Sequence, residues 1–141
     1  MSDDKHTSRA LDALNTRGLA GKREYVRGLE QRRDEEALSL LVECLCDESA
    51  YLRELAEDAL LKIGARATPV LLPLLDQGLW YTRSSAARVL GRLARHDAIP
   101  GLTQLAGDAN ASVRDAAREA LARIAQHAPE GSPIVSDAGR S

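Results

Sequence analysis

The residues best suited to catalysis or metal binding are three histidines and two cysteines, His6, His96, His127, Cys44 and Cys46. No histidine has a second histidine or a cysteine at the spacing that metal sites use. Cys44 and Cys46 are two residues apart, which on a helix directs them to different faces, so we expect two buried free thiols. The sequence also lacks a glycine-rich phosphate loop and any marked pair of carboxylates for acid–base work. It therefore predicts a protein without a catalytic centre, metal site or cofactor.

Aromatic residues are the next candidates, because Trp and Tyr bury much area at binding hot spots. The chain has one Trp, three Tyr and no Phe. Tyr51 and Tyr81 lie 30 residues apart, and Trp80 precedes the second of them. We predict that these three side chains form a ridge on a partner-binding face. A packing role for Trp80, covering the turn between two helices, is an equal alternative.

Charged residues are unevenly distributed along the chain. Residues 34–58 contain nine acidic residues and one basic one, whereas residues 83–95 contain four arginines and no acid. One interpretation is an ordinary solvated surface with salt bridges between neighbouring helices. The other is a binding surface whose basic half receives an acidic partner or a phosphate. On the second interpretation, the predicted partner-binding residues are Tyr51, Trp80, Tyr81, Arg88, Arg92, Arg118, Glu54, Glu57 and Asp58.

A repeated pattern positions these residues. Arg53, Arg83 and Arg114 are 30 and 31 residues apart, and an apolar stripe of helical spacing follows each of them. A second apolar segment precedes each arginine, so every repeat holds two helices. Pro73 falls about one turn into such a segment and is expected to kink or shorten its helix. Arg23, 30 residues before Arg53, marks a weaker copy.

The repeat gives the predicted domain organisation. We expect a degenerate N-terminal capping repeat at 9–34 and three repeats within 35–126, at about 35–65, 66–96 and 97–126. Residues 127–141 are rich in Pro, Gly and Ser, which predicts a mobile C-terminal tail. The core must be built from Leu, Ala, Ile and Val, and Leu and Ala favour helices. The predicted fold class is an all-α, right-handed α-solenoid of about three to four two-helix repeats.

The pattern around the arginines resembles a HEAT repeat, and its period of about 30 residues is similar to the short bacterial HEAT-like class first described in phycobilin lyases. The resemblance implies that the first helix of each pair is convex and the second concave. It also implies a structural ladder of charge pairs between repeats, made by Asp47, Arg53, Asp76, Arg83, Asp108 and Arg114. Asp76 departs from the pattern, because it lies seven and not six residues before its arginine. The His-Glu dipeptides of iron-binding HEAT-like hydroxylases are absent from the sequence.

The expected function is a non-catalytic scaffold or adaptor that binds a partner protein, of acidic or mixed-charge surface, on the concave face. The alternatives are a chromophore lyase or its accessory subunit, which rests on the resemblance, and a self-assembling structural subunit, with homo-oligomerisation left open. A formal net charge of −2 disfavours nucleic acid as the partner. The sequence has neither a membrane-spanning run nor a signal-peptide core, so we expect a cytoplasmic protein.

Overall fold

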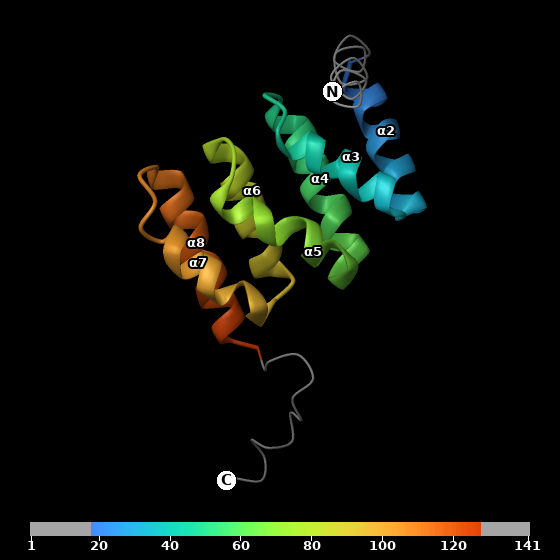
Figure 1. Cartoon of the computed structure of the whole chain (residues 1–141). Coiled ribbons are helices and arrows are strands. Elements are labelled where there is room, and N and C mark those ends of the chain that lie inside the picture. Colours follow the sequence, from blue (N-terminus) through green and yellow to red (C-terminus); the bar gives the residue numbers. More distant parts are fainter. Residues whose placement is uncertain (1–17, 128–141) are drawn as a thin grey trace, which may run out of the picture.

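The computed structural model describes residues 18–127, which form helices stacked in two layers (Figure 1). One layer contains α2 (Gly18–Arg32), α4 (Ala50–Ile63), α6 (Trp80–Arg92) and α8 (Ala111–Ala125). The other contains α3 (Glu35–Leu45), α5 (Thr68–Leu71), the 3-10 helix η2 (Leu72–Asp76) and α7 (Ile99–Leu105). Two 3-10 turns, η1 (Gly64–Ala67) and η3 (His96–Ala98), lead into α5 and α7.

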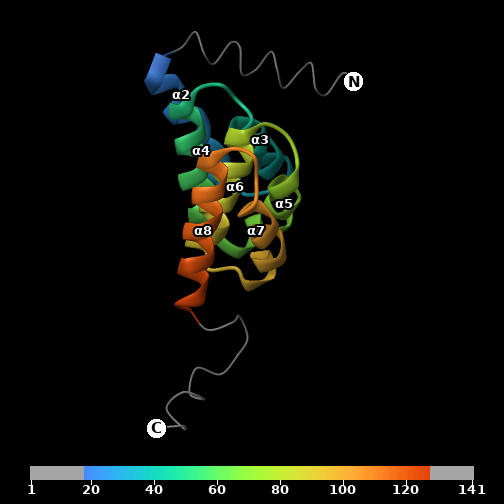
Figure 2. The same cartoon turned by 90° about the vertical axis from the view of Figure 1, so that its left-hand side faces the viewer.

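The side view separates the two layers clearly (Figure 2). We call the outward surface of α2, α4, α6 and α8 the even-helix face. No strand occurs between residues 18 and 127, and the predicted all-α solenoid is confirmed. Within the same residues, no helix has the length and apolar character needed to cross a membrane.

Local sequence signals explain where the even helices α4 and α8 begin. Ser49 accepts a hydrogen bond from the Leu52 N–H at the start of α4, and Asn110 accepts one from the Val113 N–H at the start of α8. Both residues are preferred helix caps because their side-chain oxygens satisfy otherwise unpaired backbone donors. The helix α6 differs, because the residue before it is Leu79 and supplies no side-chain cap.

Leucine and alanine build the core, as the composition predicted. Ala56, Ala86 and Ala117 recur at one register of the even helices and are fully buried. Helices α6 and α8 pack closely, because a Cβ added to Gly91 would lie 2.6 Å from both Cα and Cβ of Ala120. Small residues at this crossing let the two helix backbones pack directly against each other.

Pro73 shortens its helix, as predicted. The α-helix α5 spans only Thr68–Leu71, and the chain continues as the 3-10 helix Leu72–Asp76 with Pro73 in its first turn. Proline has no N–H and its ring clashes with the preceding turn, so regular α-helix cannot continue through it. The first helix of this repeat is therefore divided into a short α-helix and a short 3-10 helix.

The predicted repeat boundaries fall on the observed helices in part of the chain. The pairs α3–α4, α5/η2–α6 and α7–α8 lie within 35–65, 66–96 and 97–126. Helix α2 packs in the even layer beside α4, as the second helix of an N-terminal repeat would. The segment expected to hold that repeat's first helix and most of the predicted tail lie outside the described residues.

Ala94 closes α6 in a conformation that favours glycine. Its φ is 54°, its N–H donates to the Gly91 carbonyl, and the Arg95 N–H donates to the Leu90 carbonyl. This is a Schellman motif, in which the left-handed residue costs an L-amino acid about 1 kcal/mol. We expect Ala94→Gly to raise the free energy of unfolding by about 0.5–1 kcal/mol in urea titrations. A loss of stability would show that the Ala94 side chain contributes more by packing than its backbone conformation costs.

Candidate partner-binding surface

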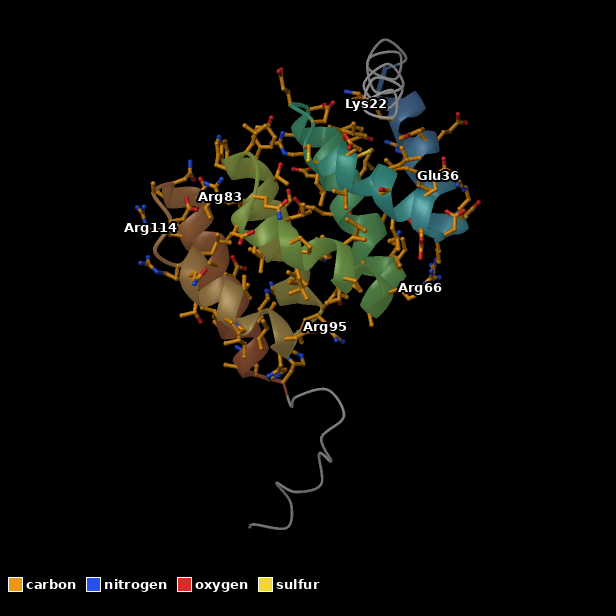
Figure 3. The ribbon with its side chains drawn as sticks, in the orientation of Figure 1. Lys22, Glu36, Arg66, Arg83, Arg95 and Arg114 are labelled. Atoms are coloured by element: carbon orange, nitrogen blue, oxygen red, sulfur yellow. The ribbon has the colours of Figure 1, made fainter. Side chains whose placement is uncertain are left out.

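The repeated arginines hold the turn that precedes their own helix. Arg53 donates from Nη1 to the carbonyls of Asp47 and Glu48, at 2.8 and 3.0 Å. Arg114 makes the same two contacts to Asp108 and Ala109, also at 2.8 and 3.0 Å. Figure 3 places Arg83 and Arg114 at this turn edge of the stack. Within a repeat, therefore, the arginine binds backbone carbonyls and not the aspartate carboxylate.

The aspartate carboxylates stabilise the turn in a different way. Asp47 accepts a hydrogen bond from the Ser49 N–H at 2.8 Å, and Asp108 accepts one from the Asn110 N–H at 2.9 Å. Asp76 is exposed, and Arg83 donates to the Gly78 carbonyl at 2.6 Å. The extra residue between Asp76 and Arg83 thus separates this aspartate from its expected role.

Contacts with the next repeat are made by Arg53 and by Arg83, and they differ in chemistry. Arg83 forms a bidentate ion pair with Asp108, with both N–O distances at 3.0 Å, and this pairing lowers the pKa of the Asp108 carboxyl. The Arg53 guanidinium carbon lies 4.2 Å from the centroid of the Tyr81 ring. Among the described residues, Arg83–Asp108 is the ion pair that matches the expected ladder between repeats, and at Arg53 a cation–π contact takes its place.

The predicted aromatic ridge divides into packed and exposed members. Tyr51 accepts a hydrogen bond from Arg23 at 3.1 Å, and Tyr81 lies under Arg53, so both tyrosines are half-buried. Trp80 packs edge-on against Tyr81, with ring centroids 5.5 Å apart, and remains 44% exposed. Its neighbour Leu79 is 52% exposed. The exposed apolar surface at the start of α6 is therefore made by Leu79 and Trp80.

Glu57 does not lie on the exposed surface where the sequence placed it. It is 7% exposed, and its carboxylate accepts hydrogen bonds from Ser85 at 2.6 Å and from Arg88 at 2.7 Å. A buried carboxylate needs such partners because desolvation of its charge is costly. Glu57 and Arg88 consequently join α4 to α6, which leaves little of either charge for a partner protein.

Arg118 lies apart from the other predicted arginines. Its register in α8 is that of Glu57 in α4 and Ala87 in α6, and both of those residues are buried, Glu57 by contacts with α6. Arg118 is exposed, because no described helix follows α8. Its register therefore places it on a different side of α8 from Arg123, and not on the surface that carries Arg92.

Exposed charges of the even-helix face form rows that cross the helices. The last turn of each even helix carries one exposed cation. We call these residues the basic row: Arg32, Lys62, Arg92 and Arg123. Glu24, Glu54 and Asp115 are exposed eight residues earlier in α2, α4 and α8, roughly 12 Å away along the helix axis. We call them the acidic row, which is interrupted on α6, where the position holds the buried Ser84.

The basic row was visible in the sequence but was missed. Each of its members lies nine residues after the repeated arginine of its own repeat, at Arg23, Arg53, Arg83 or Arg114. Of these four residues, only Arg92 is among those that the sequence predicts to bind a partner. The constant interval of nine residues from the repeated arginine is the sequence signal that identifies Lys62 and Arg123.

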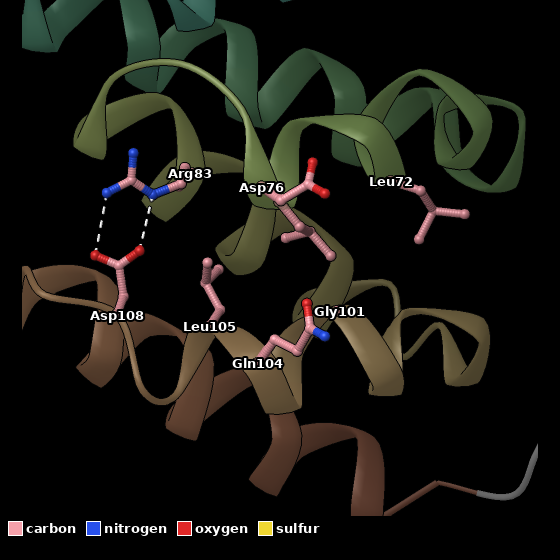
Figure 4. Close-up of a pocket in the computed structure, with 8 residues that line it drawn as sticks. Leu72, Asp76, Arg83, Gly101, Gln104, Leu105 and Asp108 are labelled. Carbon is pink, nitrogen blue, oxygen red and sulfur yellow. Dashed lines mark hydrogen bonds and ion pairs between the residues drawn. The ribbon is translucent and has the colours of Figure 1, made fainter.

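Two hollows lie near these residues. A depression of about 50 Å³ lies between α6 and α8 and is lined by Arg88, Arg92, Ala116, Glu119, Ala120 and Arg123. A larger pocket of about 360 Å³ lies between η2 and α7, with the Arg83–Asp108 pair in its wall (Figure 4). Leu72, Leu75 and Leu105 make it partly apolar, and Asp76 and Gln104 add polar groups. The depression adjoins the basic row, whereas the pocket belongs to the other layer.

The described histidines and cysteines either join neighbouring repeats or make no common site. A ring nitrogen of His96 lies 2.9 Å from the carbonyl oxygen of His127, which joins two repeats. Between residues 18 and 127, no group of three potential ligands is arranged to hold a metal ion. Cys44 is buried, Cys46 is exposed, and both are free, so the expectation of two buried thiols is wrong for Cys46.

Thiol reactivity should distinguish the two cysteines. Burial raises the pKa of Cys44 from 9.0 to about 12, so its reactive thiolate is scarce at neutral pH. Burial raises the pKa of Cys46 as well, but its side chain is exposed and Cys44 is buried. We therefore expect a thiol reagent at pH 8 to modify Cys46 alone, and Cys46→Ser to leave the folded protein unreactive. Because the folded pKa of Cys44 is raised, its contribution to stability is complete below pH 9 and is lost as the pH rises toward 12. Cys44→Ala should therefore reduce the alkaline loss of stability in urea titrations.

Fold and repeat geometry together define an α-solenoid of two-helix repeats. A family model described as HEAT repeats matches residues 68–138. The chain belongs to the HEAT-repeat family, and the resemblance stated from the sequence is confirmed.

Two solved structures are similar to this chain. Human deoxyhypusine hydroxylase, in complex with glycerol, matches with a TM-score of 0.57 and 24% identity, over 79% of this chain and 44% of the hydroxylase chain. An engineered protein matches with a TM-score of 0.47 and 20% identity, over 77% of this chain and 55% of its own. No curated protein matches the sequence. The chain thus spans less than half of the hydroxylase, and this likeness concerns the fold alone.

Proposed function

We propose that this chain is a non-catalytic scaffold of the cytoplasm that binds a partner protein on its even-helix face. The observation that carries the proposal is the exposure of Leu79 and Trp80, side by side at the start of α6. Trp80 is the only Trp of the chain, and more than two-fifths of it meets solvent. Exposed adjacent apolar side chains of this size are typical anchors of protein interfaces. Membership of the HEAT-repeat family supports a scaffold fold.

Trp80 contacts Tyr81, which begins a stripe of residues that leads along α6 to the charged part of the face. Tyr81, Arg88 and Arg92 lie at i, i+7 and i+11 of α6, so they share one side of the helix. They span roughly 16 Å at the rise of an α-helix. A partner anchored at Trp80 would reach the basic row along this stripe, passing Glu54 and Asp58 on α4. Glu57 and Arg88 would support the surface, and Arg118 would stay outside it.

Affinity capture tests the proposal with a matched pair of variants. Tagged wild-type chain, Trp80→Ala and Ile99→Ala would be compared in extracts of the native cell. Ile99 is also exposed, at 37%, but lies on α7 in the other layer. Loss of a hot-spot aromatic side chain weakens binding by about 30-fold, so Trp80→Ala should lose a partner that Ile99→Ala retains. Equal recovery of every partner by both variants, with unchanged thermal melts, would contradict the proposal.

A further inference from the structure

We propose that Lys62, Arg92 and Arg123 form a linear site for an extended acidic segment of a partner protein, with a carboxylate at every third residue. The inference rests on the proposed function and adds the chemistry of the partner. It concerns the basic row, whose members are exposed at one register of successive even helices.

The charges of these three residues are only weakly compensated by contacts within the molecule. Arg92 lies 3.9 Å from Asp58, Arg123 lies 3.6 Å from Glu119, and the acids of both pairs are more than 60% exposed. Such loose surface pairs contribute little to stability. No ion pair of Lys62 is found among residues 18–127. The contrast with Arg83, held by two 3.0 Å contacts to Asp108, separates cations that hold the stack from cations that remain available.

Arg32, the fourth member of the row, is already neutralised. It contacts Asp34 at 3.1 Å and Glu36 at 2.7 Å. Three available cations therefore remain, on α4, α6 and α8. A cation anywhere in the last turn would complement a helix dipole. These residues share one side of their helices as well, which a linear site requires and a dipole does not.

The spacing of the row favours a particular backbone conformation in the partner. Adjacent packed helices lie roughly 8–10 Å apart. A polyproline II segment has three residues per turn and a rise of about 3.1 Å, so its side chains return to one side about every 9 Å. An acidic residue at every third position would place one carboxylate at each cation. Regular β-conformation would not, because its alternate side chains point to opposite faces.

The surroundings of the row favour a peptide over a nucleic acid. Asp58 and Glu119 are exposed and lie in contact range of Arg92 and Arg123, and the acidic row runs parallel. A duplex strand carries one phosphate roughly every 3.4 Å of axis, which would set phosphates beside these carboxylates. A segment with widely spaced carboxylates avoids that repulsion.

Fluorescence anisotropy with synthetic peptides tests the site. The probe is a labelled peptide of four Glu-Pro-Pro units, and its control has the same composition with all four glutamates adjacent. The spaced peptide should bind the full chain more tightly, and Arg92→Glu should weaken it at least tenfold. Arg27→Glu is the matched control, because Arg27 is exposed on α2 outside the row and the charge change is the same. If Arg92→Glu fails to fold, Arg92→Gln and Lys62→Gln replace it and should each weaken the peptide severalfold.

Each outcome decides the inference. Equal binding of the two peptides, or equal weakening by Arg92→Glu and Arg27→Glu, would overturn it. Tighter, row-dependent binding of a thymidine oligonucleotide would also overturn it and would assign the row to nucleic acid. If capture of the partner requires Trp80 but not the basic row, only this inference is wrong. If the spaced peptide binds but capture of the partner does not depend on Trp80, only the proposed function is wrong.

Discussion

Replacing Gly91 with valine is expected to lower the free energy of unfolding by about 3 kcal/mol, at the upper end of the cost of overpacking. Even the first added carbon would lie 2.6 Å from both Cα and Cβ of Ala120, and backbone cannot move aside as a flexible side chain can. Helices α6 and α8 would have to separate along their contact. Gly91→Ala should act in the same direction to a smaller extent, although alanine favours helix by about 1 kcal/mol over glycine.

Gly28 provides the matched control for this substitution. It also lies inside an even helix, but a Cβ added there meets nothing within 4 Å. Gly28→Val should change stability by less than about 0.5 kcal/mol, as exposed positions usually do. Urea titrations of the two variants measure the difference directly. Equal losses at the two positions would mean that the close α6–α8 contact does not determine the cost.

Replacing Arg88 with alanine is the second change with a large expected effect. It removes the cation that lies 2.7 Å from the buried Glu57 carboxylate, and only the Ser85 hydroxyl would remain as a partner. Breaking a fully buried pair costs about 3–5 kcal/mol. Arg88 is itself 44% exposed, so we expect a loss of about 2 kcal/mol for this half-exposed pair.

Arg92→Ala is the control for Arg88→Ala, on the same helix and with the same chemical change. Its pair with Asp58 is 3.9 Å long and exposed, so its removal should cost less than about 0.5 kcal/mol. If the uncompensated carboxylate causes the loss, adding Glu57→Gln to Arg88→Ala should recover part of it. Indistinguishable urea midpoints for Arg88→Ala and Arg92→Ala would contradict this interpretation of the α4–α6 contact.

The sequence predicted the helices and their order well, because these depend on local periodicity. The register of Arg53, Arg83 and Arg114 located the turns, and Pro73 predicted the short helix before α6. These signals lie within a few residues of their effect. Proline, helix caps and an apolar stripe act in the same way wherever the helix packs.

The sequence was less informative about the surface, because exposure depends on residues that fold against each other from different repeats. Glu57 looked like one acid among several until Ser85 and Arg88 met it from the next helix. The sequence placed Arg118 and Arg92 on one partner-binding surface, yet the register of Arg118 in α8 puts it on another side of the stack. The availability of Lys62 and Arg123 likewise became visible only when their intramolecular contacts could be compared with those of Arg83.

Trp80 tests most directly the distinction between residues that hold the stack and residues that remain available for a partner. As the only Trp of the chain, it reports its own environment by fluorescence without a label. Addition of a captured partner should shift the Trp80 emission and protect it from acrylamide quenching. The partner is added as a fragment without tryptophan, or the emission of the partner alone is subtracted. Full binding of the partner, with Trp80 emission and quenching unchanged, would contradict the account.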